Sequence, residues 1–155
     1  MAIIGGLGVL TWRQVDIWRD SESLWTYAAS ASPSGTAHYN LGVIMVGRGE
    51  LVEAERHFRQ ALEFRPRNAD VYVNLGGALL RQGQLQEGIA HFRQALAINP
   101  KDAVAHNNLG YALRQQGRLA EAAEHFREAL RLQPDYPEAR GNLEQVTTAV
   151  SAPAR

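Results

Sequence analysis

The sequence predicts an all-α protein built as a right-handed solenoid of helical hairpins. One block of about 34 residues occurs three times, over residues 35–68, 69–102 and 103–136. Glycine and proline recur at fixed places in each block, and apolar residues recur at helical spacing. A period of this length is typical of stacked supersecondary units, so the repeat itself indicates the fold.

Equivalent residues appear in all three blocks when each block is moved by one period. The shared features are Asn-Leu-Gly in the first half, Gly near the middle, Phe and Ala in the second half, and a closing Pro. The equivalent positions are Asn40, Asn74 and Asn108; Leu41, Leu75 and Leu109; Gly42, Gly76 and Gly110; Gly49, Gly83 and Gly117; Phe58, Phe92 and Phe126; Ala61, Ala95 and Ala129; and Pro66, Pro100 and Pro134.

The second block shows how each repeat divides into two helices. The first helix is expected over about residues 70–82 and ends at Gly83, because glycine tolerates positive φ. The second helix is expected over about residues 86–98 and ends before Pro100, because the residue preceding proline is pushed away from α geometry. The connecting loops are short, so the two helices are expected to be antiparallel.

The glycines at Gly42, Gly76 and Gly110 fall within the first helix of each block, where glycine costs about 1 kcal/mol relative to alanine. This cost recurs at one repeat position. The recurrence predicts that another helix approaches closely there.

The segments that flank the repeats are predicted to cap the solenoid. Residues 21–34 are expected to hold the helix of a degenerate preceding repeat. Residues 137–149 begin like a fourth repeat, but they carry only one apolar stripe, which is typical of a capping helix. Residues 150–155 are predicted to be a disordered tail.

The composition excludes several classes of protein. The 155 residues contain 16 Lys and Arg against 16 Asp and Glu, so the formal net charge is zero. A nucleic-acid-binding protein normally carries a basic face, and therefore none is expected here. The absence of cysteine excludes disulfides, thiolate catalysis and cysteine-based zinc sites.

No catalytic residues are predicted, and neither an enzyme activity nor a cofactor is expected. His57, His91 and His125 are evenly spaced, but residues one repeat apart lie on helices whose axes are about 8–10 Å or more apart. One zinc ion holds its nitrogen ligands at about 2.0–2.1 Å, so these three residues are not expected to form a metal site. The recurring carboxylates at Glu53, Glu87 and Glu121 begin their helices, where negative charge favours the helix dipole.

The motif of each block resembles the tetratricopeptide repeat, and the resemblance extends over residues 35–136. It rests on a small residue after Leu, a Gly before the turn, a His-Phe-x-x-Ala run and a final Pro. The aromatic residue usual at the fourth place of the first helix is Tyr72 in one block, but His38 and His106 in the other two.

The resemblance implies a concave groove along the first helices, and the aligned asparagines Asn40, Asn74, Asn108 and Asn142 would face it. A primary amide can bond both the N–H and the C=O of an extended peptide. The alternative is that each Asn bonds a neighbouring helix and stabilises the stack. Further groove residues expected on this basis are Tyr39, Val43, Asp70, Val73, Leu80, Arg81, Asn107, Tyr111, Arg114 and Gln115.

One specialised role of the family is not expected here. Tetratricopeptide domains that clamp the tail carboxylates of chaperones carry Lys beside the groove asparagine. The corresponding residues in this chain are Tyr39, Val73 and Asn107.

The N-terminal segment, residues 1–20, is apolar and rich in tryptophan. The run from Ala2 to Trp12 has no charge, yet it is shorter than the roughly 20 residues of a spanning helix. One hypothesis is a helix packed on the end of the solenoid. The other is a membrane anchor or part of a spanning helix, which is favoured because Trp and Arg gather at membrane interfaces. The residues expected to dock this segment are Trp12, Arg13, Trp18, Arg19 and Trp25.

The flank over residues 12–33 also resembles the junction between membrane helices and tetratricopeptide repeats in multi-span glycosyltransferase-like proteins. Two functions follow as hypotheses. The first is a non-catalytic scaffold that binds a protein segment in its groove. The second is an accessory subunit of a membrane complex, attached through residues 1–20, with the side of the membrane left open.

Overall fold

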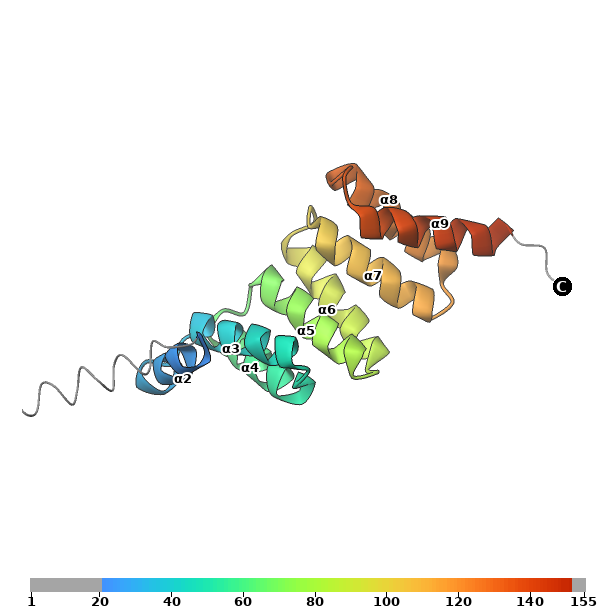
Figure 1. Cartoon of the computed structure of the whole chain (residues 1–155). Helices are drawn as coiled ribbons and strands as arrows, with labels where there is room; N and C mark the ends of the chain where they lie inside the picture. Colours follow the sequence, from blue (N-terminus) through green and yellow to red (C-terminus); the bar gives the residue numbers. More distant parts are fainter. Residues whose placement is uncertain (1–20, 152–155) are drawn as a thin grey trace, which may run out of the picture. The chain divides into compact units, whose positions relative to one another are not determined.

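The computed structural model describes residues 21–151, which form eight α-helices and no strand (Figure 1). The predicted all-α class is therefore confirmed. The helices expected over residues 70–82 and 86–98 span Ala69–Arg81 and Leu85–Ile98. The helices are α2 (Ser21–Ala31), α3 (Gly35–Arg48), α4 (Leu51–Phe64), α5 (Ala69–Arg81), α6 (Leu85–Ile98), α7 (Ala103–Gln115), α8 (Leu119–Leu132) and α9 (Pro137–Ser151).

The chain forms two compact units that divide after Pro66. The first unit holds α2, α3 and α4, and the second holds α5 to α9. Three helical hairpins, α3–α4, α5–α6 and α7–α8, correspond to the three sequence blocks. We call α3, α5, α7 and α9 the leading helices, and α4, α6 and α8 the trailing helices.

Each leading helix of the three hairpins begins with a side-chain cap at the same repeat position. The caps are Ser34, Asn68 and Asp102, and each accepts a hydrogen bond from a backbone N–H in the first turn. Asp102 Oδ1 accepts two such bonds, from the N–H groups of Val104 and Ala105 at 2.9 and 3.0 Å. An N-cap of this kind stabilises a helix by about 1 kcal/mol.

The turn inside each hairpin depends on a glycine with positive φ. Gly49, Gly83 and Gly117 have φ of 80°, 81° and 77°. A side chain at these positions would strain the left-handed backbone. The prediction that Gly83 ends its helix is therefore confirmed, with the same geometry in all three hairpins.

The glycines inside the leading helices lie against the phenylalanines of the trailing helices. A Cβ atom built on Gly42, Gly76 or Gly110 would lie only 2.5, 2.8 or 2.8 Å from the aromatic ring of Phe58, Phe92 or Phe126. No real Cβ contact is that short, so only glycine lets each ring pack directly on the leading helix. The close helix approach predicted from the repeated glycine is confirmed.

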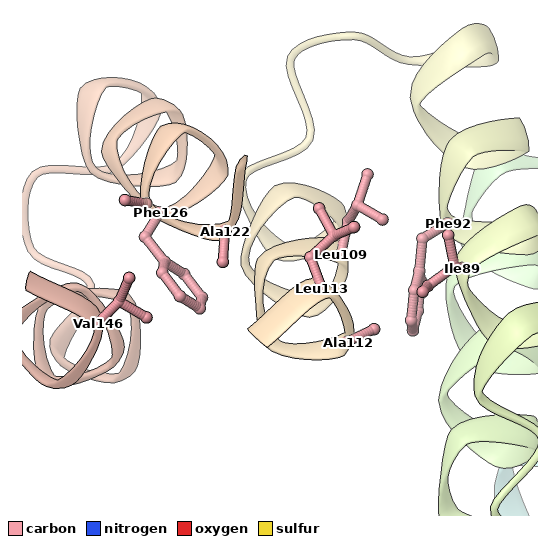
Figure 2. Packing of buried hydrophobic residues seen from close by; sticks show 9 residues of the cluster. Ile89, Phe92, Leu109, Ala112, Leu113, Ala122, Phe126 and Val146 are labelled. Atoms are coloured by element: carbon pink, nitrogen blue, oxygen red, sulfur yellow. The ribbon is translucent and has the colours of Figure 1, made fainter. Parts of the chain in front are cut away.

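The core of the second unit is a continuous apolar cluster contributed by α6 to α9. Figure 2 shows Ile89 and Phe92 of α6 facing α7 from one side, with Phe126 of α8 on the other side near Val146 of α9. Phe92, Phe126 and Leu113 are 0–1% exposed. The same ring of Phe92 therefore packs on its own hairpin and joins that hairpin to the next one.

The ends of the chain differ from the expectation in one respect. Helix α9 continues through Ser151, whereas the tail was predicted to begin at residue 150. Residues 1–20, with Trp12, Arg13, Trp18 and Arg19, lie outside the described residues, as do residues 152–155. None of the described helices is both long enough and apolar enough to cross a membrane.

Candidate functional site

The candidate site is the surface of the leading helices on which the sequence places the aligned asparagines. In the second unit this surface is carried by α5, α7 and α9, and we call it the leading-helix face. Its expected members are Asp70, Val73, Asn74, Leu80, Arg81, Asn107, Asn108, Tyr111, Arg114, Gln115 and Asn142. The corresponding residues of the first unit are Tyr39, Asn40 and Val43 on α3.

The four asparagines have different surroundings despite their shared repeat position. Asn108 is half-buried on α7, and within the described residues its side-chain amide makes no hydrogen bond. Asn74 donates from its side chain to the carbonyl oxygen of Asp70 on its own helix, at 2.9 Å. Asn142 donates to Asn107 Oδ1 across the α7–α9 contact, at 3.1 Å. The amide of Asn108 is therefore available to bind a ligand, whereas the amide of Asn142 is already hydrogen-bonded to Asn107.

Asn107 belongs to the packing between α7 and α9. Its side chain is only 7% exposed, and it accepts the bond from Asn142. Arg114 of α7 completes this contact by donating to Asn142 Oδ1 at 3.4 Å and to Gln145 Oε1. The repeat pattern does not predict the contact to Gln145, because the equivalent residues of the earlier repeats have no side-chain amide.

Tyr111 is an exposed aromatic residue of this face. It is 36% exposed, and the guanidinium carbon of Arg114 lies 4.9 Å from the centre of its ring. Such a cation–π contact orients the arginine over the ring while both remain accessible. Val104, which lies nearer the start of α7 than Tyr111 does, is also exposed. Helix α7 thus presents an apolar residue, an amide, an aromatic ring and a cation in succession.

The remaining candidates on α5 are Asp70 and Arg81, which are exposed, and Val73 and Leu80, which are half-buried. In the first unit, Val43 is exposed and Asn40 is half-buried. The amide of Asn40 resembles that of Asn108, since it also makes no hydrogen bond within the described residues. Tyr39 lies with its ring 6.1 Å from that of Phe58.

Trp25 is the only described member of the residues expected to dock the N-terminal segment. It is half-buried on α2, which packs against α3. Glu22 of α2 forms an ion pair with Arg48 of α3. Helix α2 is thus joined to the first hairpin.

Two of the recurring carboxylates form local ion pairs near the beginning of the trailing helices. Glu53 pairs with Arg56 at 2.7 Å, and Glu121 pairs with Arg118. All four side chains are exposed to solvent, so each pair contributes little to stability. These contacts agree with the structural interpretation of the glutamates.

Two histidine pairs, which were not predicted from the sequence, form inside hairpins. Nδ1 of His38 lies 3.3 Å from Nδ1 of His57, and Nδ1 of His106 lies 3.0 Å from Nδ1 of His125. Burial lowers the pKa of His57 and of His125. One sequence feature could have indicated these pairs. The first and third blocks both carry His at the same two positions, whereas the second block has Tyr72 at the first of these positions.

Comparison with known proteins defines the family. A family model described as tetratricopeptide repeat matches the chain over residues 7–69, 46–103 and 73–137. The chain belongs to the tetratricopeptide repeat family. The matched ranges include most of the N-terminal flank and all three hairpins, so the tetratricopeptide architecture extends over more than half of the chain.

Among curated proteins, two O-mannosyl-transferases of Drosophila melanogaster are similar to part of this chain. Protein O-mannosyl-transferase Tmtc2 is 34% identical over 70 residues, which are 45% of this chain and 7% of that protein. Protein O-mannosyl-transferase Tmtc1 is 39% identical over 70 residues, which are 45% of this chain and 8% of that protein. The similarity therefore spans less than a tenth of each relative.

Solved tetratricopeptide structures have the same fold. The first such domain of Spaghetti (RPAP3), bound to an HSP90 peptide, has a TM-score of 0.74 at 21% identity, covering 76% of this chain and 94% of that one. MamA has a TM-score of 0.78 at 19% identity, covering 89% of this chain and 81% of that one. The predicted helical-hairpin solenoid is thereby confirmed.

Proposed function

We propose that this chain is a non-catalytic interaction module that binds an extended protein segment on its leading-helix face. The observation that carries the proposal is the half-buried amide of Asn108, which makes no hydrogen bond within the described residues. It lies on the same helix as the exposed side chains of Val104 and Tyr111. A protein segment would satisfy the amide and cover the apolar groups in one contact.

The chemistry of this face suits recognition of a peptide backbone together with one or two side chains. The amide of Asn108 offers donors and an acceptor to the N–H and C=O of an extended strand. Tyr111 offers a rigid aromatic surface, which is typical of residues that dominate binding energy. Arg114 lies over that ring and is anchored by Gln145, so little side-chain entropy remains to be lost on binding.

The relatives support the same class of function. One structural neighbour is bound to a peptide of HSP90. In this chain, the residues beside the asparagines are not lysines, so we propose a general protein segment rather than a chaperone tail as the ligand.

Replacing Asn74 and Asn108 with Ala should weaken peptide binding about tenfold while the helix content remains. Each lost neutral hydrogen bond costs about 0.5–1.5 kcal/mol, and about 1.4 kcal/mol is a factor of ten in affinity. The ligands would be peptides selected from a random library on the unmodified chain, and their dissociation constants would be measured by calorimetry.

The matched control is Gln94→Ala, which removes an exposed amide from the trailing helix α6. This variant should bind the selected peptides as the unmodified chain does. If the double asparagine variant also bound them unchanged, the asparagines would have the structural role, and the leading-helix face would not be the binding site.

A second proposal concerns residues 1–20, which we suggest attach the module to a membrane or to a membrane complex. The supporting observation is the uncharged run from Ala2 to Trp12, followed by Trp and Arg side chains. The full chain should sediment with vesicles of phosphatidylcholine and phosphatidylglycerol, and deletion of residues 1–20 should release a folded protein. Unfolding on deletion, with no sedimentation of the full chain, would show that the segment caps the repeats.

A further inference from the structure

The three hairpins differ at one matched pair of positions that join the leading and trailing helices. In the third hairpin the pair is His106 and His125, whose Nδ1 atoms are 3.0 Å apart. In the second hairpin the equivalent residues are Tyr72 and His91, whose rings stack with centres 5.8 Å apart. The second hairpin therefore has the same fold with only one imidazole.

The orientation of His106 is fixed from its far side. Its Nε2 lies 3.1 Å from the carbonyl oxygen of Pro100, so Nε2 carries the proton and donates it to that oxygen. Nδ1 of His106 then has a free lone pair directed at His125. A histidine that binds a metal through one nitrogen usually donates its other N–H to a carbonyl or a carboxylate in this way.

The distance between the two nitrogens fits a shared metal ion. Two nitrogens bound to one zinc ion at about 2.0–2.1 Å in tetrahedral geometry lie about 3.3 Å apart. The observed 3.0 Å is within a few tenths of an ångström of this separation. Without an ion, a single proton on Nδ1 of His125 bridges the pair.

We propose that His106 and His125 bind one divalent transition-metal ion, such as Zn²⁺, through their two Nδ1 atoms. Binding moves the proton of His125 from Nδ1 to Nε2, so both rings remain neutral. Among the described residues no group of three His, Cys, Asp or Glu converges on one point, and water therefore completes the coordination. The site has two protein ligands, one fewer than the open zinc sites of enzymes.

The charges around the pair are mixed. Glu124 interacts electrostatically with His125, whereas Arg93 opposes it. Glu121 and Glu128 also interact with His125, but they are already paired with Arg118 and Arg131. The proposal therefore rests on the positions of the two Nδ1 atoms and not on the surrounding charge.

The first hairpin has a similar pair that is less suited to an ion. His38 and His57 are 3.3 Å apart, but Nη2 of Arg56 lies 3.3 Å from Nε2 of His57 and donates to it. The proton of His57 is therefore held on Nδ1, between the two rings. The guanidinium also repels a cation, so this pair should bind Zn²⁺ more weakly than the pair in the third hairpin.

Calorimetric titration of the full chain with zinc chloride would test the proposal. The unmodified chain should bind zinc, and His106→Tyr should abolish the tighter site. This variant should still fold, because tyrosine already occupies the same place in the second hairpin at Tyr72. The matched control His38→Tyr should retain the tighter site.

The converse variant gains a site. Tyr72→His places a second imidazole opposite His91 and should add a binding event that the unmodified chain lacks. The proposal is overturned if the unmodified chain takes up no zinc, or if His106→Tyr binds zinc as the unmodified chain does. If His106→Tyr fails to fold, a Tyr72→His variant that folds and binds no additional ion is equally decisive against it.

Discussion

Replacing Phe92 with Ala should destabilise the second unit by about 3–5 kcal/mol, which is the range for truncation of a fully buried phenylalanine. The side chain is fully buried, packs on Gly76 of its own hairpin and belongs to the cluster that includes Leu109 of the next hairpin. Truncation removes the ring from both contacts. It leaves a cavity that the helices, held by short turns, can close only in part.

Urea denaturation followed by circular dichroism would measure this change. The matched control is Phe64→Ala, because Phe64 is 49% exposed at the end of α4 and should lose much less free energy of unfolding. Similar losses for the two variants would mean that burial of the ring in the hairpin core is not the source of its contribution.

Gly76→Leu should cost about 3 kcal/mol or more, because it introduces a side chain where a ring already lies. Even a Cβ atom at this position would be 2.8 Å from the ring of Phe92 and 3.1 Å from the carbonyl oxygen of Gly88. The ring could shift, but the backbone of α6 could not move without separating the two helices.

The neighbouring residue supplies the control for this substitution. A Cβ atom on Gly77 would meet nothing within 4 Å, so Gly77→Ala should leave stability unchanged or raise it by up to about 1 kcal/mol. The cost of Gly76→Ala should also shrink in a Phe92→Leu background, since the two positions are in direct contact. Equal effects at Gly76 and Gly77 would contradict the steric explanation.

The parts of the structure that follow the repeat period were predictable from the sequence. The turn at Gly83 and the close approach at Gly76 each depend on backbone geometry, which identical residues in three copies reveal. The first helix of the second hairpin begins one residue earlier than expected, at Ala69, because the cap at Asn68 was not considered.

The parts that depend on contacts between unlike positions were not predictable in this way. His106 and His125 occupy different repeat positions. Their Nδ1 atoms lie close together because these two residues face each other where α7 packs against α8. The bond from Asn142 to Asn107 likewise joins two different repeat positions. Such side-chain pairs require the three-dimensional arrangement of the hairpins.

The pairing of a glycine with a phenylalanine inside each hairpin has a consequence for folding kinetics. Gly76 and Phe92 are near neighbours along the chain, so their contact requires closure of only a short loop. Proteins dominated by such local contacts have low contact order and fold quickly. Each hairpin can therefore act as a nucleus, and structure can spread from it to the adjoining hairpin.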